Sequence, residues 1–154
     1  LNGIPVRYIV DTGGQTGTVA TAAVKAGAKA QGYAGVSDLN SNKSVFQKGV
    51  ISNVALSPHH TLGQLSSLIL PAHGFFAELG VVGILGGDAF AGTVVTIDDR
   101  NRTLVLNVPY RPERLKVSDG LPLLSTNSLH PIVEVPYGNT AVEVRLDTGV
   151  TDVL

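Results

Sequence analysis

The chain has 154 residues, of which 44% are hydrophobic and 15% are charged, and its net charge at pH 7 is −1. This length suits one domain, or one domain with part of another, and the apolar share can fill a core. Without a basic stripe, nothing indicates a nucleic-acid partner, and no apolar run approaches the ~20 residues of a membrane span. The absence of cysteine excludes disulfides, thiol nucleophiles and cysteine-bound zinc.

The first residues predict a tight turn. Asn2-Gly3 is typical of a type I′ hairpin turn, in which both residues have positive φ. Such a turn needs a strand before it, and the chain has no methionine, so Leu1 is not an initiator residue. We therefore expect a fragment, or the ordered part of a longer chain, with any signal peptide upstream.

The predicted elements are mostly short strands joined by turns. Short helices are expected within residues 18–27 and 73–79 and after Gly86-Gly87, where Asp88 could cap the first turn. Strands are expected at residues 4–10, 31–52 (a hairpin), 54–56, 67–71, 81–85, 93–97, 103–108, 132–137 and 140–146, with a polar segment at 57–66 and a proline-rich linker at 109–124. Many short strands at close spacing indicate an all-β barrel or sandwich.

The tripeptide Asp-Thr-Gly occurs near both ends of the chain, as Asp11-Thr12-Gly13 and as Asp147-Thr148-Gly149. Each copy follows a predicted strand, and the hairpin at 132–146 repeats the start of the chain. A repeat of this long period predicts a second, similar lobe that begins near residue 125.

A pair of aspartates on such loops can form a complete acid–base device. Two carboxylates about 3 Å apart cannot both ionise, so one acts as base on a water while the other donates its proton to a carbonyl oxygen. Asp11 and Asp147 are the candidates. The threonine after each Asp can send its hydroxyl to the backbone of the opposing loop, and the glycine lets a backbone N–H approach the carboxylate.

These features resemble the retropepsin-like aspartic peptidases, especially the bacterial type with two such domains in tandem. The resemblance is carried by the run from Asn2 to Gly13, by Gly83-Ile84-Leu85-Gly86-Gly87-Asp88-Ala89-Phe90, and by the strands Val95–Asp98 and Thr103–Leu106. Order and spacing match over residues 1 to about 107. Gly14 departs from the family pattern, which usually has Ala or Ser there.

The resemblance implies a retropepsin-like acid protease barrel with a short helix at 1–108, a linker at 109–124 and the start of a second similar domain at 125–154. It implies an aspartic endopeptidase that acts on peptides or proteins and needs no metal or organic cofactor. In this family residues 31–52 form the flap over bound peptide. The implied site residues are Asp11 and Asp147 as catalytic groups, Thr12, Gly13, Thr148 and Gly149 in the supporting loops, and Ile84, Leu85 and Gly86 packed beneath.

Several alternatives stay open. One lobe supplies one Asp, so activity needs a second lobe in the same chain or a homodimer partner. A non-catalytic peptide-binding or dimerisation module could use the same fold. Many bacterial tandem members are exported, which allows a periplasmic or secreted location while leaving the compartment unknown.

The remaining motifs favour structural interpretations. Adjacent His59-His60 would point to opposite faces of a strand and fit a solvated loop better than a metal site. The glycines of Gly83–Gly87 lack the Lys-Ser/Thr of a phosphate loop. No Gly-x-Ser-x-Gly elbow of a serine hydrolase is present.

Overall fold

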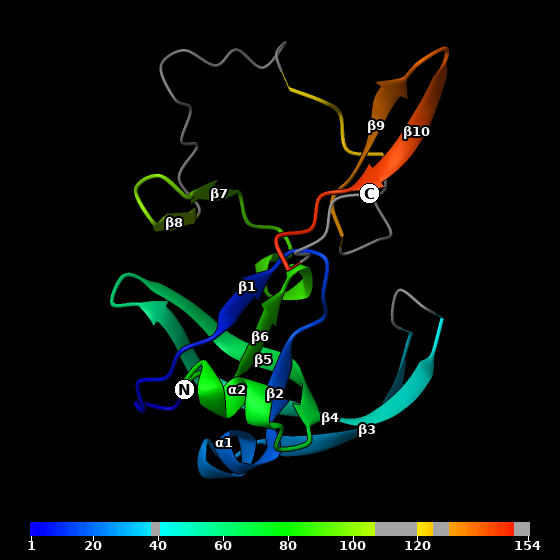
Figure 1. Cartoon of the computed structure of the whole chain (residues 1–154). Coiled ribbons are helices and arrows are strands. Elements are labelled where there is room, and N and C mark those ends of the chain that lie inside the picture. The colour runs from blue at the N-terminus through cyan, green and yellow to red at the C-terminus, as the bar shows by residue number, and fades with distance from the viewer. Residues whose placement is uncertain (38–40, 107–119, 125–129, 150–154) are drawn as a thin grey trace.

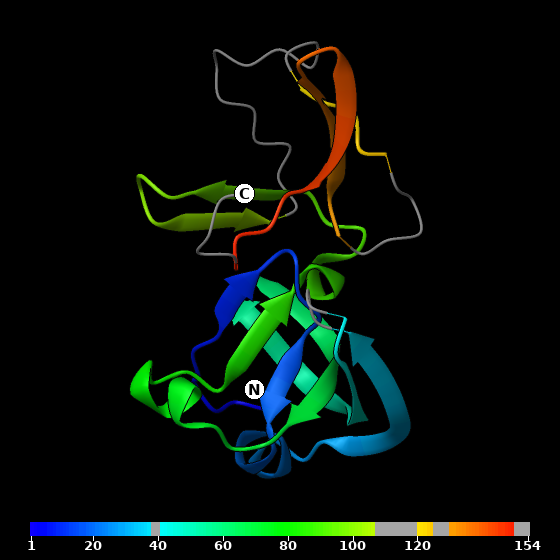
Figure 2. The same cartoon turned by 45° about the vertical axis from the view of Figure 1, so that its right-hand side comes forward.

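A computed structural model of the chain describes residues 1–37, 41–106, 120–124 and 130–149. In these ranges the chain is mostly β, with one six-stranded sheet and two separate two-stranded sheets. The large sheet curls on itself at one end of the molecule and the two small hairpins lie at the other (Figures 1 and 2). The all-β class predicted from the sequence is therefore confirmed.

The large sheet has the strand order β1-β6-β2-β5-β4-β3. Its members are β1 (Ile9–Asp11), β2 (Gly17–Val19), β3 (Lys29–Ser37), β4 (Lys43–Ser57), β5 (His60–Leu70) and β6 (Gly83–Gly86). Strands β3, β4 and β5 form an antiparallel meander, whereas β1 pairs in parallel with β6 and β2 with β5. Because β1 and β6 run in parallel, the segments that follow them leave the sheet at the same edge.

Three short helices lie at the margins of this sheet: α1 (Ala20–Lys25), α2 (Gly74–Glu78) and the 3-10 helix η1 (Gly87–Phe90). All three fall where the sequence predicted helical turns. The Nδ1 atom of His73 accepts the N–H of Phe75 at 3.2 Å, so His73 is the N-cap of α2. Within the described ranges, none of these helices has the length and apolar character that crossing a membrane requires.

The two hairpins that the sequence predicted form separate two-stranded sheets. They are β7 (Val95–Asp98) with β8 (Thr103–Leu106), and β9 (Ile132–Tyr137) with β10 (Thr140–Arg145). Leu123, at the end of the predicted linker, bridges to Val133 of β9, and Leu124 donates its N–H to Ile132 O at 2.9 Å. Most of the linker predicted at 109–124, and residues 107–108 of the preceding strand, lie outside the described residues.

The structure corrects two predicted strands and the loop between them. The predicted strand at 54–56 is the end of the 15-residue β4, which continues past a register shift at Asn53, whose φ is 55°. The predicted polar loop at 57–66 is mostly strand, because β5 begins at His60 and pairs with β4. Backbone pairing with a neighbouring strand outweighs the weak strand preference of these polar residues.

The first two predicted elements are shorter in the structure. The strand expected at 4–10 is limited to Ile9–Asp11, and Pro5, which has no N–H to donate, lies in the part that does not join the sheet. The helix expected from residue 18 begins at Ala20, because Gly17–Val19 pairs with β5 and β6 as β2.

The turn at Asn2-Gly3 has the predicted conformation. Both residues have positive φ, 46° and 79°, and Ile4 donates its N–H to Leu1 O at 2.8 Å. The turn also docks on the sheet, since Asn2 N–H bonds Asn53 O at 3.0 Å.

The hydrophobic core fills the curl of the large sheet. Its buried members are Leu1, Ala26, Ile51, Val54, Leu65, Leu85 and Phe90. Beside it, the buried hydroxyl of Thr18 bonds Ser67 Oγ and the Tyr8 hydroxyl, each at 2.8 Å. Burial raises the pKa of Tyr8, and the bond to Thr18 opposes that rise.

We expect Ile51→Ala to lower the free energy of unfolding by about 2–5 kcal/mol, because Ile51 is 0% exposed and the truncation leaves a cavity. Val45→Ala on the same strand is the matched control, since Val45 is 72% exposed and should change stability by about 0.5 kcal/mol or less. Urea denaturation of both variants measures this. Equal losses would contradict the described core.

Candidate active site

The first Asp-Thr-Gly loop begins where β1 ends, beside β6. The register pairs Ile9 with Ile84, Val10 with Leu85 and Asp11 with Gly86. Leu85 is buried in the core, so the strand that carries Asp11 is fixed from one side by a packed neighbour.

Gly86 lies directly beneath the loop. A Cβ built on Gly86 would lie 2.6 Å from Thr16 N and 2.6 Å from Gln15 C, closer than side-chain atoms approach backbone. The N–H of Gly87 bonds Gly14 O at 3.3 Å. Of the three residues expected beneath the loop, Gly86 lies under it, while Ile84 and Leu85 pair with Ile9 and Val10 of the strand that leads into it.

The second Asp-Thr-Gly loop follows β10 and faces the first. Within each loop the glycine N–H donates to the aspartate two residues earlier: Gly13 N–H to Asp11 Oδ1 at 3.0 Å, and Gly149 N–H to Asp147 Oδ1 at 2.8 Å. The two copies therefore share one local geometry. Figure 1 shows the loop after β10 reaching down to the end of β1.

The threonine of each loop hydrogen-bonds to the backbone of the other loop. Thr12 Oγ1 donates to Leu146 O at 2.8 Å, and Thr148 Oγ1 donates to Val10 O at 3.1 Å. In return each hydroxyl oxygen accepts the backbone N–H of the other threonine: Thr12 N–H to Thr148 Oγ1 at 3.1 Å, and Thr148 N–H to Thr12 Oγ1 at 3.2 Å. These four reciprocal bonds join segments from opposite ends of the chain, and they follow an approximate two-fold symmetry.

This docking brings the two aspartates together. A Cβ added to Gly149 would lie 2.6 Å from both carboxylate oxygens of Asp11, and one added to Gly13 would overlap the carboxylate of Asp147. Each glycine is therefore packed against the opposing carboxyl group, and only a residue without a side chain fits there. Both aspartates remain partly exposed, so water can reach them.

The electrostatics of Asp11 have two opposing parts. Burial raises its pKa most, and a side-chain hydrogen bond to Asp147 and the charge of Asp147 raise it further. The backbone N–H groups of Gly13 and Gly14 favour the ionised form and pull the pKa down again. The pKa of Asp11 stays above its ordinary value on balance, so the pair can hold a proton that a lone Asp would release.

The structure also shows two contacts that the sequence reasoning missed or misread. His130 Nδ1 lies 3.5 Å from Thr12 O, which places this histidine beside the first loop. Asp88 bonds Thr16 of that loop, whereas the sequence suggested a cap for its own helix. The sequence did hold a signal for the position of Asp88. It directly follows Ile84-Leu85-Gly86-Gly87, and part of this segment pairs with β1, which leads into the first loop.

The predicted flap corresponds to the β3–β4 hairpin. Its long strands are present, while its tip at 38–40 lies outside the described residues. Tyr33, on β3, is 74% exposed.

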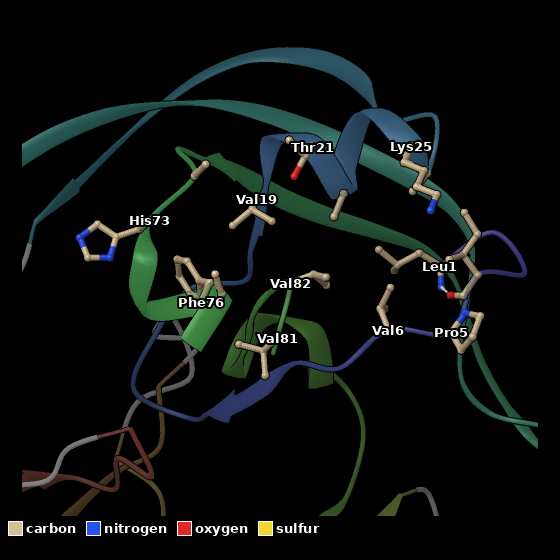
Figure 3. A pocket seen from close by; sticks show the side chains of 15 residues that line it. Leu1, Pro5, Val6, Val19, Thr21, Lys25, His73, Phe76, Val81 and Val82 are labelled. Carbon is tan, nitrogen blue, oxygen red and sulfur yellow. Dashed lines mark hydrogen bonds between the residues drawn. The ribbon is translucent and has the colours of Figure 1, made fainter. Parts of the chain in front are cut away.

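An apolar hollow of about 440 Å³ lies elsewhere, between α1, α2 and the N-terminal segment (Figure 3). Val19, Phe76 and Val82 face into it, and Lys25 and His73 lie at its two ends. No described residue of either Asp-Thr-Gly loop lines it, so the hollow is separate from the aspartate pair.

The other candidate ligands do not gather. Across the described ranges, no group of three or more His, Asp or Glu side chains is placed to hold a metal ion. His59 lies in the turn between β4 and β5, and His60 is the first residue of β5.

Comparison with known proteins adds no relative. No protein-family model matches the chain, and no match was found among curated proteins or solved structures. The geometry of the aspartate pair is therefore the feature from which a function can be inferred.

We expect Asp11→Asn to raise the melting temperature at neutral pH and to leave it nearly unchanged at about pH 3. The fold binds the Asp11 proton more tightly than the unfolded chain does, so this contribution is present at low pH and is lost as pH rises through the raised pKa. Thermal unfolding between about pH 3 and pH 7 measures the difference.

Asp98→Asn is the control, because it should change the melting temperature at neutral pH in the opposite direction. Hydrogen bonds from Asn101 lower the pKa of Asp98, so its contribution is present at neutral pH and is lost as pH falls through that lowered value. This variant should be slightly less stable than wild type at neutral pH. The same sign for both variants would contradict the described environment of Asp11.

The contact between Gly13 and the Asp147 carboxyl can be tested by substitution. Gly13→Ala should push the Asp147 carboxyl away and bring the pKa of Asp11 back toward its ordinary value, because the neighbouring charge and hydrogen bond are lost. Carboxyl carbon NMR titration measures this. Gly74→Ala is the control, since its Cβ would meet only Glu78 Oε1 at 3.8 Å. An unchanged Asp11 titration in Gly13→Ala would refute the close approach.

Proposed function

We propose that the chain is an aspartic endopeptidase of the retropepsin-like type, in which Asp11 and Asp147 activate one water between them. The observation that carries the proposal is the crossed pair of Asp-Thr-Gly loops, which join through Thr12 and Thr148 and bring the two carboxyls into contact. Turns containing Asp and Gly are common singly. Two copies that dock on each other reciprocally are the arrangement that paired acid–base chemistry requires.

The chemistry follows from a pair that shares one proton. The ionised carboxyl removes a proton from the water, and the water oxygen attacks the peptide carbonyl carbon. At the same time the protonated carboxyl donates its proton to the carbonyl oxygen. The resulting tetrahedral diol collapses when the protonated carboxyl donates its proton to the amide nitrogen, the ionised carboxyl removes a proton from one diol hydroxyl, and the C–N bond breaks. The products are a carboxylic acid and an amine, and the pair returns to its singly protonated state.

The environment of the pair suits this cycle. The raised pKa of Asp11 keeps a proton available, and the N–H groups of Gly13 and Gly149 each hold a carboxylate oxygen in place. Neither step needs a metal or an organic cofactor.

The proposal extends to the architecture. Residues 1–108 would form the first retropepsin-like barrel, and β9–β10 with Asp147 would open the second. In this chain Asp147 supplies the second carboxyl, so the partner lobe begins in the same chain. A homodimer in which each chain supplies one carboxyl is the other arrangement, and a non-catalytic peptide-binding module is the other function.

We expect the chain to cleave a mixed peptide library between about pH 3 and pH 7, with Asp11→Asn and Asp147→Asn each lowering kcat/KM by about a thousandfold or more. Mass spectrometry of the products measures cleavage. The Asp98→Asn variant, a solvated carboxyl on the β7–β8 turn, should cut like wild type.

The outcomes separate the possibilities. Loss in both variants supports one dyad made of Asp11 and Asp147. Loss in Asp11→Asn alone would show that the partner of Asp11 comes from a second chain. No cleavage by the wild type at any pH, with peptide affinity that Asp11→Asn leaves intact, would overturn the enzyme in favour of the binding module.

A further inference from the structure

A hydrogen-bond network around Thr16, called the relay below, connects η1 to the first Asp-Thr-Gly loop. Thr16 is 0% exposed, and both its backbone N–H and its hydroxyl donate to Asp88 Oδ1, at 2.8 and 2.5 Å. The same hydroxyl oxygen accepts the N–H of Gly86 at 3.0 Å. The N–H and the hydroxyl of Thr16 are thus held by partners on β6 and η1, the elements that lie beneath the loop, while its carbonyl accepts the N–H of Leu68 on β5 at 2.9 Å.

The loop that Thr16 ends has few side chains that could support it. It reads Gly13-Gly14-Gln15-Thr16, followed by Gly17, and Gln15 is exposed. Glycines have no side chains to pack and they allow many backbone conformations. The shape of this segment must therefore come from hydrogen bonds. Backbone bonds supply some of them: Gly87 N–H to Gly14 O, Gly14 N–H to Asp11 O and Leu68 N–H to Thr16 O. The side chains of Thr16 and Asp88 supply the rest.

The carboxylate of Asp88 is engaged in this relay and does not cap its own helix. Its hydrogen bonds go to Thr16, whose position in the chain is 72 residues away. A negatively charged acceptor makes stronger and shorter bonds than a neutral one, which suits a group that must fix a glycine-rich segment.

We propose that Thr16 and Asp88 are positioning residues for the Asp11 carboxyl, which hold the loop so that the N–H groups of Gly13 and Gly14 face it. The effect of this positioning on catalysis rests on the proposed function, whereas the positioning itself is a property of the folded chain. If the relay is broken, Gly13 and Gly14 move away and the ionised form of Asp11 loses its donors. The pKa of Asp11 then rises, because the bonds that lower it are weakened.

The test compares matched pairs of variants. Thr16→Val removes the hydroxyl and keeps the shape, while Thr16→Ser keeps the hydroxyl. Asp88→Ala removes the acceptor, while Asp88→Asn keeps an oxygen at that place. Thr18→Val is the control for losing a buried threonine hydroxyl, since Thr18 is also 0% exposed but bonds Ser67 and Tyr8 instead.

Two readouts are used on the same full chain: the Asp11 titration by carboxyl carbon NMR, and the pH profile of kcat/KM for peptide cleavage. We expect Thr16→Val and Asp88→Ala to raise the apparent pKa of Asp11 by about half to one unit. They should also lower kcat/KM on the order of tenfold and move the acidic limb of its pH profile to higher pH. Thr16→Ser and Thr18→Val should stay close to wild type in both readouts, and Asp88→Asn, which keeps a neutral acceptor, should change both less than Asp88→Ala does.

An unchanged Asp11 titration in folded Thr16→Val and Asp88→Ala would overturn the proposal, and so would an equal shift in Thr18→Val. If Thr16→Val does not fold, the Asp88 pair decides by the same criterion. If the wild type cuts no peptide at any pH, the proposed function fails. The titration then still decides whether Thr16 and Asp88 position Asp11.

Discussion

The crossed hydrogen bonds of Thr12 and Thr148 are the constraint on which the rest of the site depends. They are the direct link between a loop at the start of the chain and a loop near its end, and each threonine serves as both donor and acceptor. Because the bonds are reciprocal, neither loop can shift without straining both pairs. The separation of the two carboxyls is therefore fixed by four hydrogen bonds between threonine hydroxyls and the backbone of the opposing loop.

Close approach of two like charges needs compensation, and the glycines provide it. A residue with a Cβ at Gly13 or Gly149 would collide with the opposing carboxyl, so the tripeptide must end in glycine. The same glycines offer backbone N–H groups to the aspartates. Burial and the neighbouring carboxyl keep a proton on the pair, while the N–H donors stabilise the ionised partner. One shared proton is the state in which such a pair can act as acid and base together.

The two loops are supported unequally. The first continues a strand that pairs with β6 and lies over the core, and Thr16 and Asp88 tie its far end to the same elements. The second follows β10, whose side chains are all exposed. A two-stranded hairpin is marginally stable on its own. In the part of the chain that the structure describes, the threonine bonds, His130 and the bridge from Leu123 connect this hairpin to other segments.

The sequence alone determined the β class, the hairpins, the I′ turn at Asn2-Gly3 and the two Asp-Thr-Gly loops that follow strands, because each has a local signal: short apolar runs, turn dipeptides and a repeated tripeptide. Tertiary structure decided the rest. The continuity of β4 past Asn53 and the strand at 60–66 depend on pairing with neighbouring strands, which outweighs local propensity. The role of Asp88 was misread and the position of His130 was missed, because their partners lie 72 and 118 residues away and only the folded backbone brings them together.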